Sequence, residues 1–150
     1  MRVILDANVL LSFAIGARGA DGVIGTILRL AIDGRCTLLL SPELLREVRD
    51  KLQTKRYFVD RFNAQAVDDF IAFLVSIGHL MPPLTEEIPA VTRDRKDNYL
   101  VAAALIGEAD YLVSGDRHLL ELGDALAPLK IRSPRAFVEE FLAENDGRGG

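Results

Sequence analysis

Short apolar runs alternate with amphipathic segments along the whole chain. Continuous apolar residues bounded by turn formers predict buried strands at 3–5, 37–40 and 111–113, and further short strands are expected at 79–81 and 129–131. Apolar positions at helical spacing predict helices at 23–33, 42–53, 64–77, 97–106 and 134–142. Because buried strands alternate with helices, the pattern predicts an α/β fold, a three-layer α/β/α sandwich with a central, mainly parallel sheet.

The same pattern predicts the extent of the domain. A length of 150 residues suits one domain, and no repeat or linker divides the chain. We therefore expect a single domain over residues 1–144. The polar, glycine-rich segment 145–150 is expected to form a flexible tail.

Two of the predicted strands carry a carboxylate at their C-terminal end. Asp6 follows the run 3–5, and Asp116 follows the run 111–113 after Ser114 and a glycine. Ligands of open α/β sheets bind outside the carboxyl ends of the strands, so both acids are expected at one edge. Two carboxylates there repel each other unless a cation lies between them, which predicts a divalent metal site.

Two further acids are candidates for the same edge. Asp97 opens a helix whose following residues are almost all apolar, so its first turn is expected near the sheet. Glu47 lies beside the apolar stripe of its helix and is better placed to reach inward than Glu43. Taken singly, each acid has an ordinary explanation as a cap, a turn residue or a solvated side chain. Several elements directed at one edge favour a site.

A group of carboxylates suits Mg²⁺ or Mn²⁺, which prefer oxygen ligands. Such an ion activates water and stabilises the leaving oxygen in phosphodiester hydrolysis. His79 and His118 have no metal-ligand spacing, which argues against a zinc hydrolase. Cys36 is the single cysteine, which excludes an internal disulfide, favours a reducing cytoplasmic setting and is expected in the core. No apolar run has the length of a membrane span or the form of a signal peptide.

The net charge of −4 comes from 18 basic and 22 acidic residues. Subtracting the four candidate acids from the 22 leaves 18, so the acidic excess equals the predicted site. No Lys or Arg occurs in 63–92, which leaves a basic face possible elsewhere. Basic residues gather just before that stretch, at Arg46, Arg49, Lys51, Lys55, Arg56 and Arg61.

The segment Lys55-Arg56-Tyr57-Phe58 combines charge with aromatic rings. Such a segment is typical either of a surface that stacks a nucleobase or of a helix end that packs against the core. The burial habits of aromatic residues favour the second interpretation.

Four segments of the chain form one pattern: Val3–Leu10, Leu44–Val48, Asp94–Asn98 and Leu112–Asp116. Together they resemble the PIN-domain nucleases, most closely the VapC-like toxins of prokaryotic toxin–antitoxin pairs. The end of the chain, Ile131–Phe137, resembles the last strand and helix of the family. The likeness covers nearly the whole chain, and the opening motif and the Ser-Gly-Asp motif are its most specific parts.

The resemblance implies a metal-dependent endoribonuclease that hydrolyses RNA phosphodiester bonds with one or two Mg²⁺ or Mn²⁺ ions. It implies a cognate antitoxin and a homodimer as partners. It places the catalytic and metal-binding acids at Asp6, Glu47, Asp97 and Asp116. It also implies that Asn8 steadies Asp6 and that Ser114 lies near the metal or a water, although Asn8 is equally typical of a turn residue bonding its own backbone.

The loop before Asp97 departs from the family pattern. Relatives often read Asp-Pro-x-Asp there, and Arg95 stands at the proline position. Asp94 is therefore a secondary candidate, either as a fifth acid or as a loop residue contacting Arg93. RNA phosphate contacts are expected from basic residues beside the acids, unless these are solvated; they are Arg93, Arg95, Lys96 and Arg117.

Two other functions remain open. One is a non-catalytic PIN-like module that binds RNA or a protein. The other is a phospho-receiver or phosphatase domain with Asp6 as phosphoacceptor. A phosphatase needs a second Asp where Asn8 stands, and a receiver needs a Lys after a late strand, where Ser114 stands. No glycine-rich turn follows the first strand, which argues against a dinucleotide-binding fold.

Overall fold

The computed structural model describes residues 1–16, 22–84 and 95–148, and for 95–97 and 146–148 it describes the backbone alone. Within this part of the chain the strands form one five-stranded sheet in the order β3-β2-β1-β4-β5. All neighbouring strands pair in parallel. The strands are β1 (Arg2–Leu5), β2 (Thr37–Leu40), β3 (His79–Leu80), β4 (Tyr111–Val113) and β5 (Lys130–Arg132).

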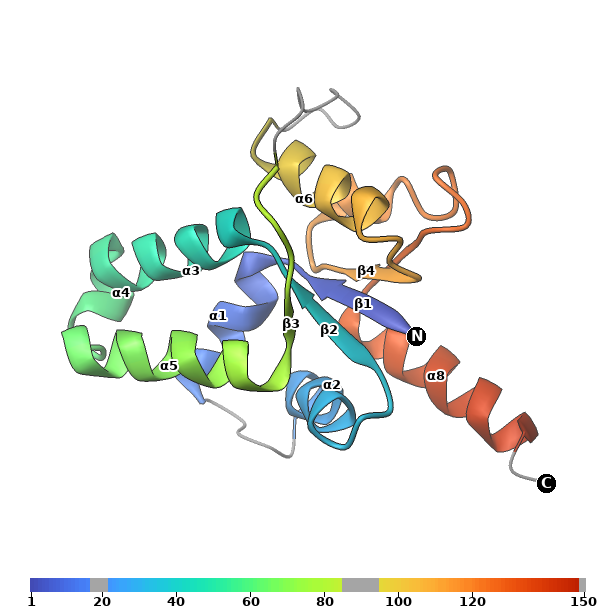
Figure 1. Ribbon diagram of the computed structural model, residues 1–150, viewed down its shortest axis with the longest axis horizontal. Helices are drawn as coiled ribbons and strands as arrows, with labels where there is room; N and C mark the ends of the chain where they lie inside the picture. Colours follow the sequence, from blue (N-terminus) through green and yellow to red (C-terminus); the bar gives the residue numbers. More distant parts are fainter. Residues whose placement is uncertain (17–21, 85–94, 149–150) are drawn as a thin grey trace.

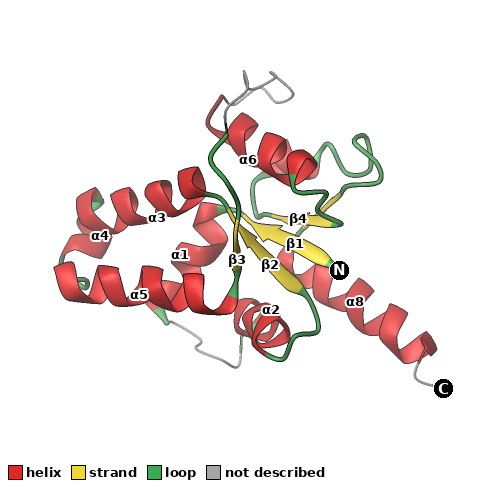
Figure 2. Cartoon of the chain, in the orientation of Figure 1, coloured by secondary structure: helices red, strands yellow, loops and turns green. Residues whose placement is uncertain are grey.

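Helices cover both faces of this sheet. In Figure 1, α6 lies on one side of the strands and α2 with α8 on the other, and Figure 2 shows the strands enclosed between the two helical layers. The predicted three-layer α/β/α sandwich is therefore confirmed. None of the helices in the described ranges is long and apolar enough to cross a membrane. The helices are α1 (Ala7–Ile15), α2 (Val23–Ile32), α3 (Pro42–Thr54), α4 (Arg56–Val59), α5 (Ala64–Ile77), α6 (Arg95–Ile106), α7 (Arg117–Leu120) and α8 (Pro134–Arg148).

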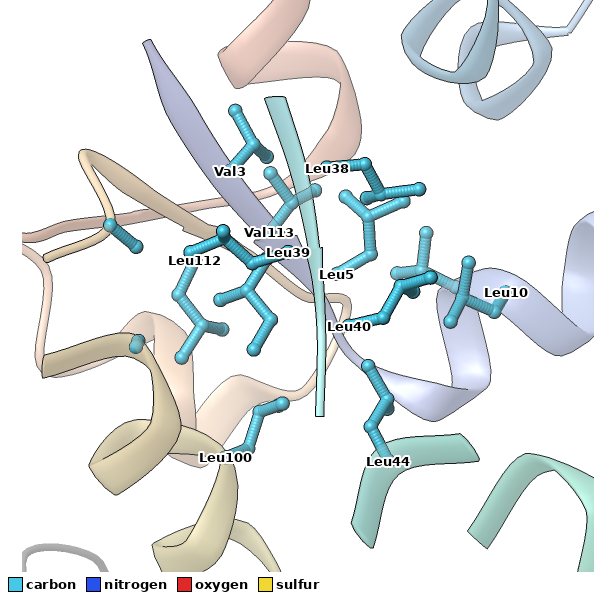
Figure 3. Packing of buried hydrophobic residues seen from close by; sticks show 14 of the residues in the cluster. Val3, Leu5, Leu10, Leu38, Leu39, Leu40, Leu44, Leu100, Leu112 and Val113 are labelled. Carbon is cyan, nitrogen blue, oxygen red and sulfur yellow. The ribbon is translucent and has the colours of Figure 1, made fainter. Parts of the chain in front are cut away.

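The central strands are apolar on both faces because both faces are covered. This explains why they read as continuous apolar runs rather than as alternating ones. In Figure 3, Leu5 lies toward Leu10 of α1, whereas Leu39 and Leu112 lie toward Leu100 of α6. All five leucines are at most 2% exposed. The packed core therefore fixes the strand ends that carry the candidate site. Cys36 is buried in the same core, as predicted.

The structure contains a helix, α1, that the sequence pattern does not predict. Its nine residues include only two polar ones, Asn8 and Ser12, which are too few to display a clear helical period. A helix that is apolar on most sides is a buried one, and here it packs against α3 and α2. Asp6 caps its start, and Gly16, at a φ of 67°, ends it in the left-handed conformation that glycine adopts without strain.

The last helix is longer than its apolar pattern indicates. α8 continues to Arg148 rather than ending near Leu142. The Asn145 side chain donates to the Phe141 carbonyl at 2.7 Å, one turn back along the helix. The predicted end of this helix is therefore corrected. The helix includes residues 145–148 of the segment 145–150 expected to form a tail.

The strand order places a topological switch point between β1 and β4. From β1 the chain moves to β2 on one side, and from β4 it moves to β5 on the other, while β1 and β4 are neighbours. Open α/β sheets bind their ligands in the crevice outside the carboxyl ends of the strands at such a point. Asp6 and Asp116 follow these two strands.

Candidate active site

Asp6 is the first residue after β1. Its backbone N–H donates to the Val113 carbonyl of β4 at 3.0 Å, so the pairing of β1 with β4 continues to the acid. Its Oδ1 accepts a hydrogen bond from the Val9 N–H at 2.8 Å. Its Oδ2 accepts one from the Ser114 hydroxyl. The residue is only 6% exposed, so its carboxylate is held in one orientation by bonds to both oxygens.

Ser114 connects the two strand-ending acids. It is completely buried, and besides donating to Asp6 it accepts a hydrogen bond from the Asp116 N–H at 2.9 Å. Asp116 is half-buried and caps α7, with its Oδ1 accepting from the His118 N–H at 2.7 Å. Both acids thus serve as helix caps, the ordinary explanation for such residues. They also share Ser114 at the switch point, as the positions of the strands suggest.

The electrostatics of Asp6 disfavour its charged form. Burial raises the pKa of Asp6 above its ordinary value, and the negative charge of Asp116 raises it further. The hydrogen bonds from Ser114 and Val9 and the positive charge of Lys51 oppose this rise without cancelling it. A cation between the two acids would relieve the remaining cost.

The two glutamates of α3 are both half-buried and bind different neighbours. Glu47 accepts at Oε2 from the hydroxyl of Tyr99 on α6 at 3.0 Å. Glu43 accepts at Oε1 from the Leu84 N–H at 2.7 Å, and its Oε2 is buried without a hydrogen-bond partner in the described part of the chain. Glu47 therefore fastens α3 to the helix that carries Asp97, whereas Glu43 holds the chain that follows β3.

Asp97 lies in the first turn of α6, next to the buried Asn98. Its side chain falls outside the described residues, as do the side chains of Arg95 and Lys96 and the whole of Arg93 and Asp94. Among the side chains that are described, no three acidic, histidine or cysteine residues lie close enough to hold a metal ion. Glu47 is therefore not in a three-acid group with Asp6 and Asp116.

The remaining predicted residues lie around this pair. Asn8, in the first turn of α1, is exposed, and its Oδ1 accepts from the Lys51 Nζ of α3 at 3.2 Å. The hydrogen bond that the structure shows for the Asn8 side chain is therefore with Lys51 rather than with Asp6. Arg117, directly after Asp116, has a side chain that is 86% exposed. The sequence pattern assigns no role to Lys51, since its contact with the site depends on α1.

The donors that the structure brings together fit a hard divalent cation. Asp6 and Asp116 offer carboxylate oxygens, and Mg²⁺ is commonly held by one or two carboxylates while water fills its other positions. Burial and the charge of Asp116 disfavour the charged form of Asp6, and a nearby cation would favour that form. Ser114 and the Val9 N–H orient the Asp6 carboxylate, as supporting groups do around metal ligands.

Fold and site together define a parallel α/β protein with an acidic pair at the switch point of its sheet. A family model for the PIN domain matches residues 2–118, which span β1 to β4 and both acids. The chain belongs to the PIN-domain family, which confirms the resemblance to the PIN-domain nucleases.

Comparison with individual proteins adds evidence on the fold. The chain is similar to the crystal structure of VapBC2 from Rickettsia felis bound to a DNA fragment from the VapBC2 promoter. The TM-score is 0.59 and the sequence identity is 13%. The match covers 89% of this chain and 98% of the other. At this identity the likeness shows a shared fold. No curated protein matches the chain significantly.

Proposed function

We propose that the chain is a Mg²⁺- or Mn²⁺-dependent endoribonuclease. The observation that carries the proposal is the placement of Asp6 and Asp116, connected through Ser114, at the β1–β4 switch point. Membership of the PIN-domain family supports nuclease activity. The electrostatic cost at Asp6 supports a cation as part of the active site.

Each residue has a distinct task in the proposed site. Asp6 and Asp116 would hold the ion, and Ser114 connects them by donating to the Asp6 carboxylate and accepting from the Asp116 N–H. Asp97 is the proposed third acid, delivered by the first turn of α6. Glu47 fixes α3 against that helix through Tyr99. When bound, the ion lowers the pKa of the attacking water and stabilises charge on the leaving oxygen, so that water is added across a P–O bond of the RNA.

The proposal extends to partners. By analogy with VapBC2, we propose that the chain is the toxin of a toxin–antitoxin pair with a cognate antitoxin as its partner. From the resemblance to VapC-like toxins we also propose that it acts in the cytoplasm as a homodimer. Arg117, exposed directly after Asp116, is a proposed contact for the RNA phosphates. Arg93 and Arg95 are proposed for the same role from their positions beside Asp97.

Cleavage of RNA by the purified full chain tests the function. With Mn²⁺ or Mg²⁺ the wild type should cleave, and EDTA should abolish cleavage. Asp6→Asn and Asp116→Asn should lose more activity than the ~10–100-fold typical of removing a supporting residue. Asp33→Asn is the matched control because Asp33 is exposed at the end of α2, before β2 begins, and it should cleave normally.

Two results would contradict the proposal. Cleavage that survives EDTA and both substitutions would show that the acids and the metal are not required. A stable aspartyl-phosphate on Asp6 would instead favour the phosphoacceptor function. Growth arrest on expression of the wild type, relieved in the same two variants, would support the toxin assignment.

A further inference from the structure

A pocket opens beside the acidic pair, between α1, α3 and α4. Its volume is about 440 Å³, within the ~300–1,000 Å³ typical of small-ligand sites. Its polar and aromatic lining comes from Asn8, Ser12, Lys51, Lys55, Tyr57 and Phe58. Lys51 of this lining is close enough for its charge to act on Asp6, so the pocket lies next to the proposed metal site.

The charge of the lining opposes that of the protein as a whole. The chain has a net charge of −4, but of the described residues that line the pocket two are lysines and none is acidic. Lys51 is held at the edge nearer Asp6 by its bond to Asn8 at 3.2 Å. Lys55, one turn further along the chain, is exposed. These two cations suit the phosphates of a polyanion.

Tyr57 contributes an exposed aromatic side chain to the same pocket. It is 51% exposed, whereas its neighbour Phe58 is partly buried and packs against the core. The Arg61 guanidinium lies over one face of the Tyr57 ring, 3.8 Å from its centre, and the Phe58 ring is perpendicular to the Tyr57 ring with 5.4 Å between the ring centres. The ring is therefore fixed while half of the residue's surface stays open. The packing of Phe58 agrees with a helix end that packs against the core, and the exposure of Tyr57 leaves the base-stacking interpretation open.

We propose that this pocket binds a nucleotide of the RNA strand adjacent to the scissile phosphate, with its base stacked on Tyr57 and its phosphates on Lys51 and Lys55. The inference rests on the proposed function and adds a substrate-binding site to it. Stacking on an aromatic face tolerates any base, so this site contributes affinity and register rather than a strict sequence preference.

Binding of RNA without cleavage tests this site. The probe is a short fluorescein-labelled single-stranded RNA of mixed sequence, titrated with the full chain in EDTA and followed by fluorescence anisotropy. Tyr57→Ala should weaken binding by about 5- to 150-fold, the range expected for one stacked base. Tyr57→Phe keeps the ring and should bind like the wild type. This pair separates stacking from loss of the hydroxyl.

Salt dependence tests the phosphate contacts. Lys55→Gln should reduce the slope of log affinity against log salt by about 0.7, the value for one phosphate contact on a single strand. Arg135→Gln is the matched control because it removes one exposed positive charge from α8, far from α4 in Figure 1, and it should leave the slope unchanged. Far-UV circular dichroism of all variants checks that each is folded.

The outcomes distinguish this site from the function on which it rests. If the wild type binds and cleaves RNA while Tyr57→Ala and Lys55→Gln bind it equally well, the nucleotide site is refuted, the nuclease function stands, and the pocket is left for a protein partner. If the wild type neither binds nor cleaves RNA, both proposals are refuted.

Discussion

Replacing Ser114 with alanine removes the hydroxyl that connects the two acids. In its completely buried position this hydroxyl donates to the Asp6 carboxylate and accepts from the Asp116 N–H. A hydrogen bond to a charged group contributes ~1.5–3 kcal/mol, and one between neutral groups ~0.5–1.5 kcal/mol. Ser114→Ala should therefore lower the free energy of unfolding by about 2–4.5 kcal/mol at neutral pH.

The size of this loss should depend on pH. Because burial raises the pKa of Asp6 in the folded state, the stability linked to Asp6 is fully present below its unfolded pKa of ~3.9. It is lost as the pH rises through the folded pKa. The Ser114 hydroxyl lowers that folded pKa. Without it the folded pKa rises further, so the alanine variant should lose more stability than the wild type as the pH rises above about 4.

Urea unfolding across this pH range, followed by far-UV circular dichroism, measures the effect. Ser41→Ala is the matched control because Ser41 is 1% exposed, follows β2, and bonds to the Leu44 N–H at 3.0 Å as the cap of α3. It should lose about 1 kcal/mol at every pH. A Ser114→Ala loss below about 1 kcal/mol, or one that does not grow with pH, would refute the reasoning.

Two further variants test the electrostatics and the packing. Asp6→Asn should raise the Tm of the metal-free protein near pH 8, because the amide carries no charge to desolvate, and leave the Tm unchanged near pH 4. Calorimetry measures the Tm of both proteins. Equal Tm values for the variant and the wild type at pH 8 would count against the raised pKa of Asp6. Gly78→Ala should lower the free energy of unfolding by ~1–3 kcal/mol in urea titrations, since an added Cβ would lie 2.7 Å from the Leu40 Cδ1 and 2.9 Å from the Leu38 carbonyl oxygen. Gly115→Ala, where a Cβ meets nothing within 4 Å, is its neutral control, and equal stability of the two variants would contradict the packing argument.

The strands and their terminal acids are predictable because their signals are local. A run such as Val3–Leu5 is apolar at every position only where both faces of a sheet are covered, and Asp6 directly follows it. The nearness of Asp6 to Ser114 is not a local property, since the two residues are 108 positions apart. It requires that β1 and β4 be neighbours, and the strand order alone decides this.

Helix α1 and the partners of Glu47 show the limits of local pattern. α1 has too few polar residues to display a helical period, so Lys51 and the pocket beside it could not be placed without the fold. The pattern predicts that Glu47 reaches further inward than Glu43, whereas both are half-buried, and the bond of Glu47 to Tyr99 depends on how α3 lies against α6. Such contacts between distant elements follow from tertiary packing, which periodicity does not encode.

The proposal that Asp6 and Asp116 share a divalent cation is tested most directly by Mn²⁺ binding to the full chain, measured by isothermal titration calorimetry. The wild type and the Asp33→Asn control should bind Mn²⁺ with the same affinity. Asp6→Asn and Asp116→Asn should each bind it at least about 10-fold more weakly, since each removes a ligand rather than a supporting group. Wild-type affinity in both substituted proteins would contradict the metal site.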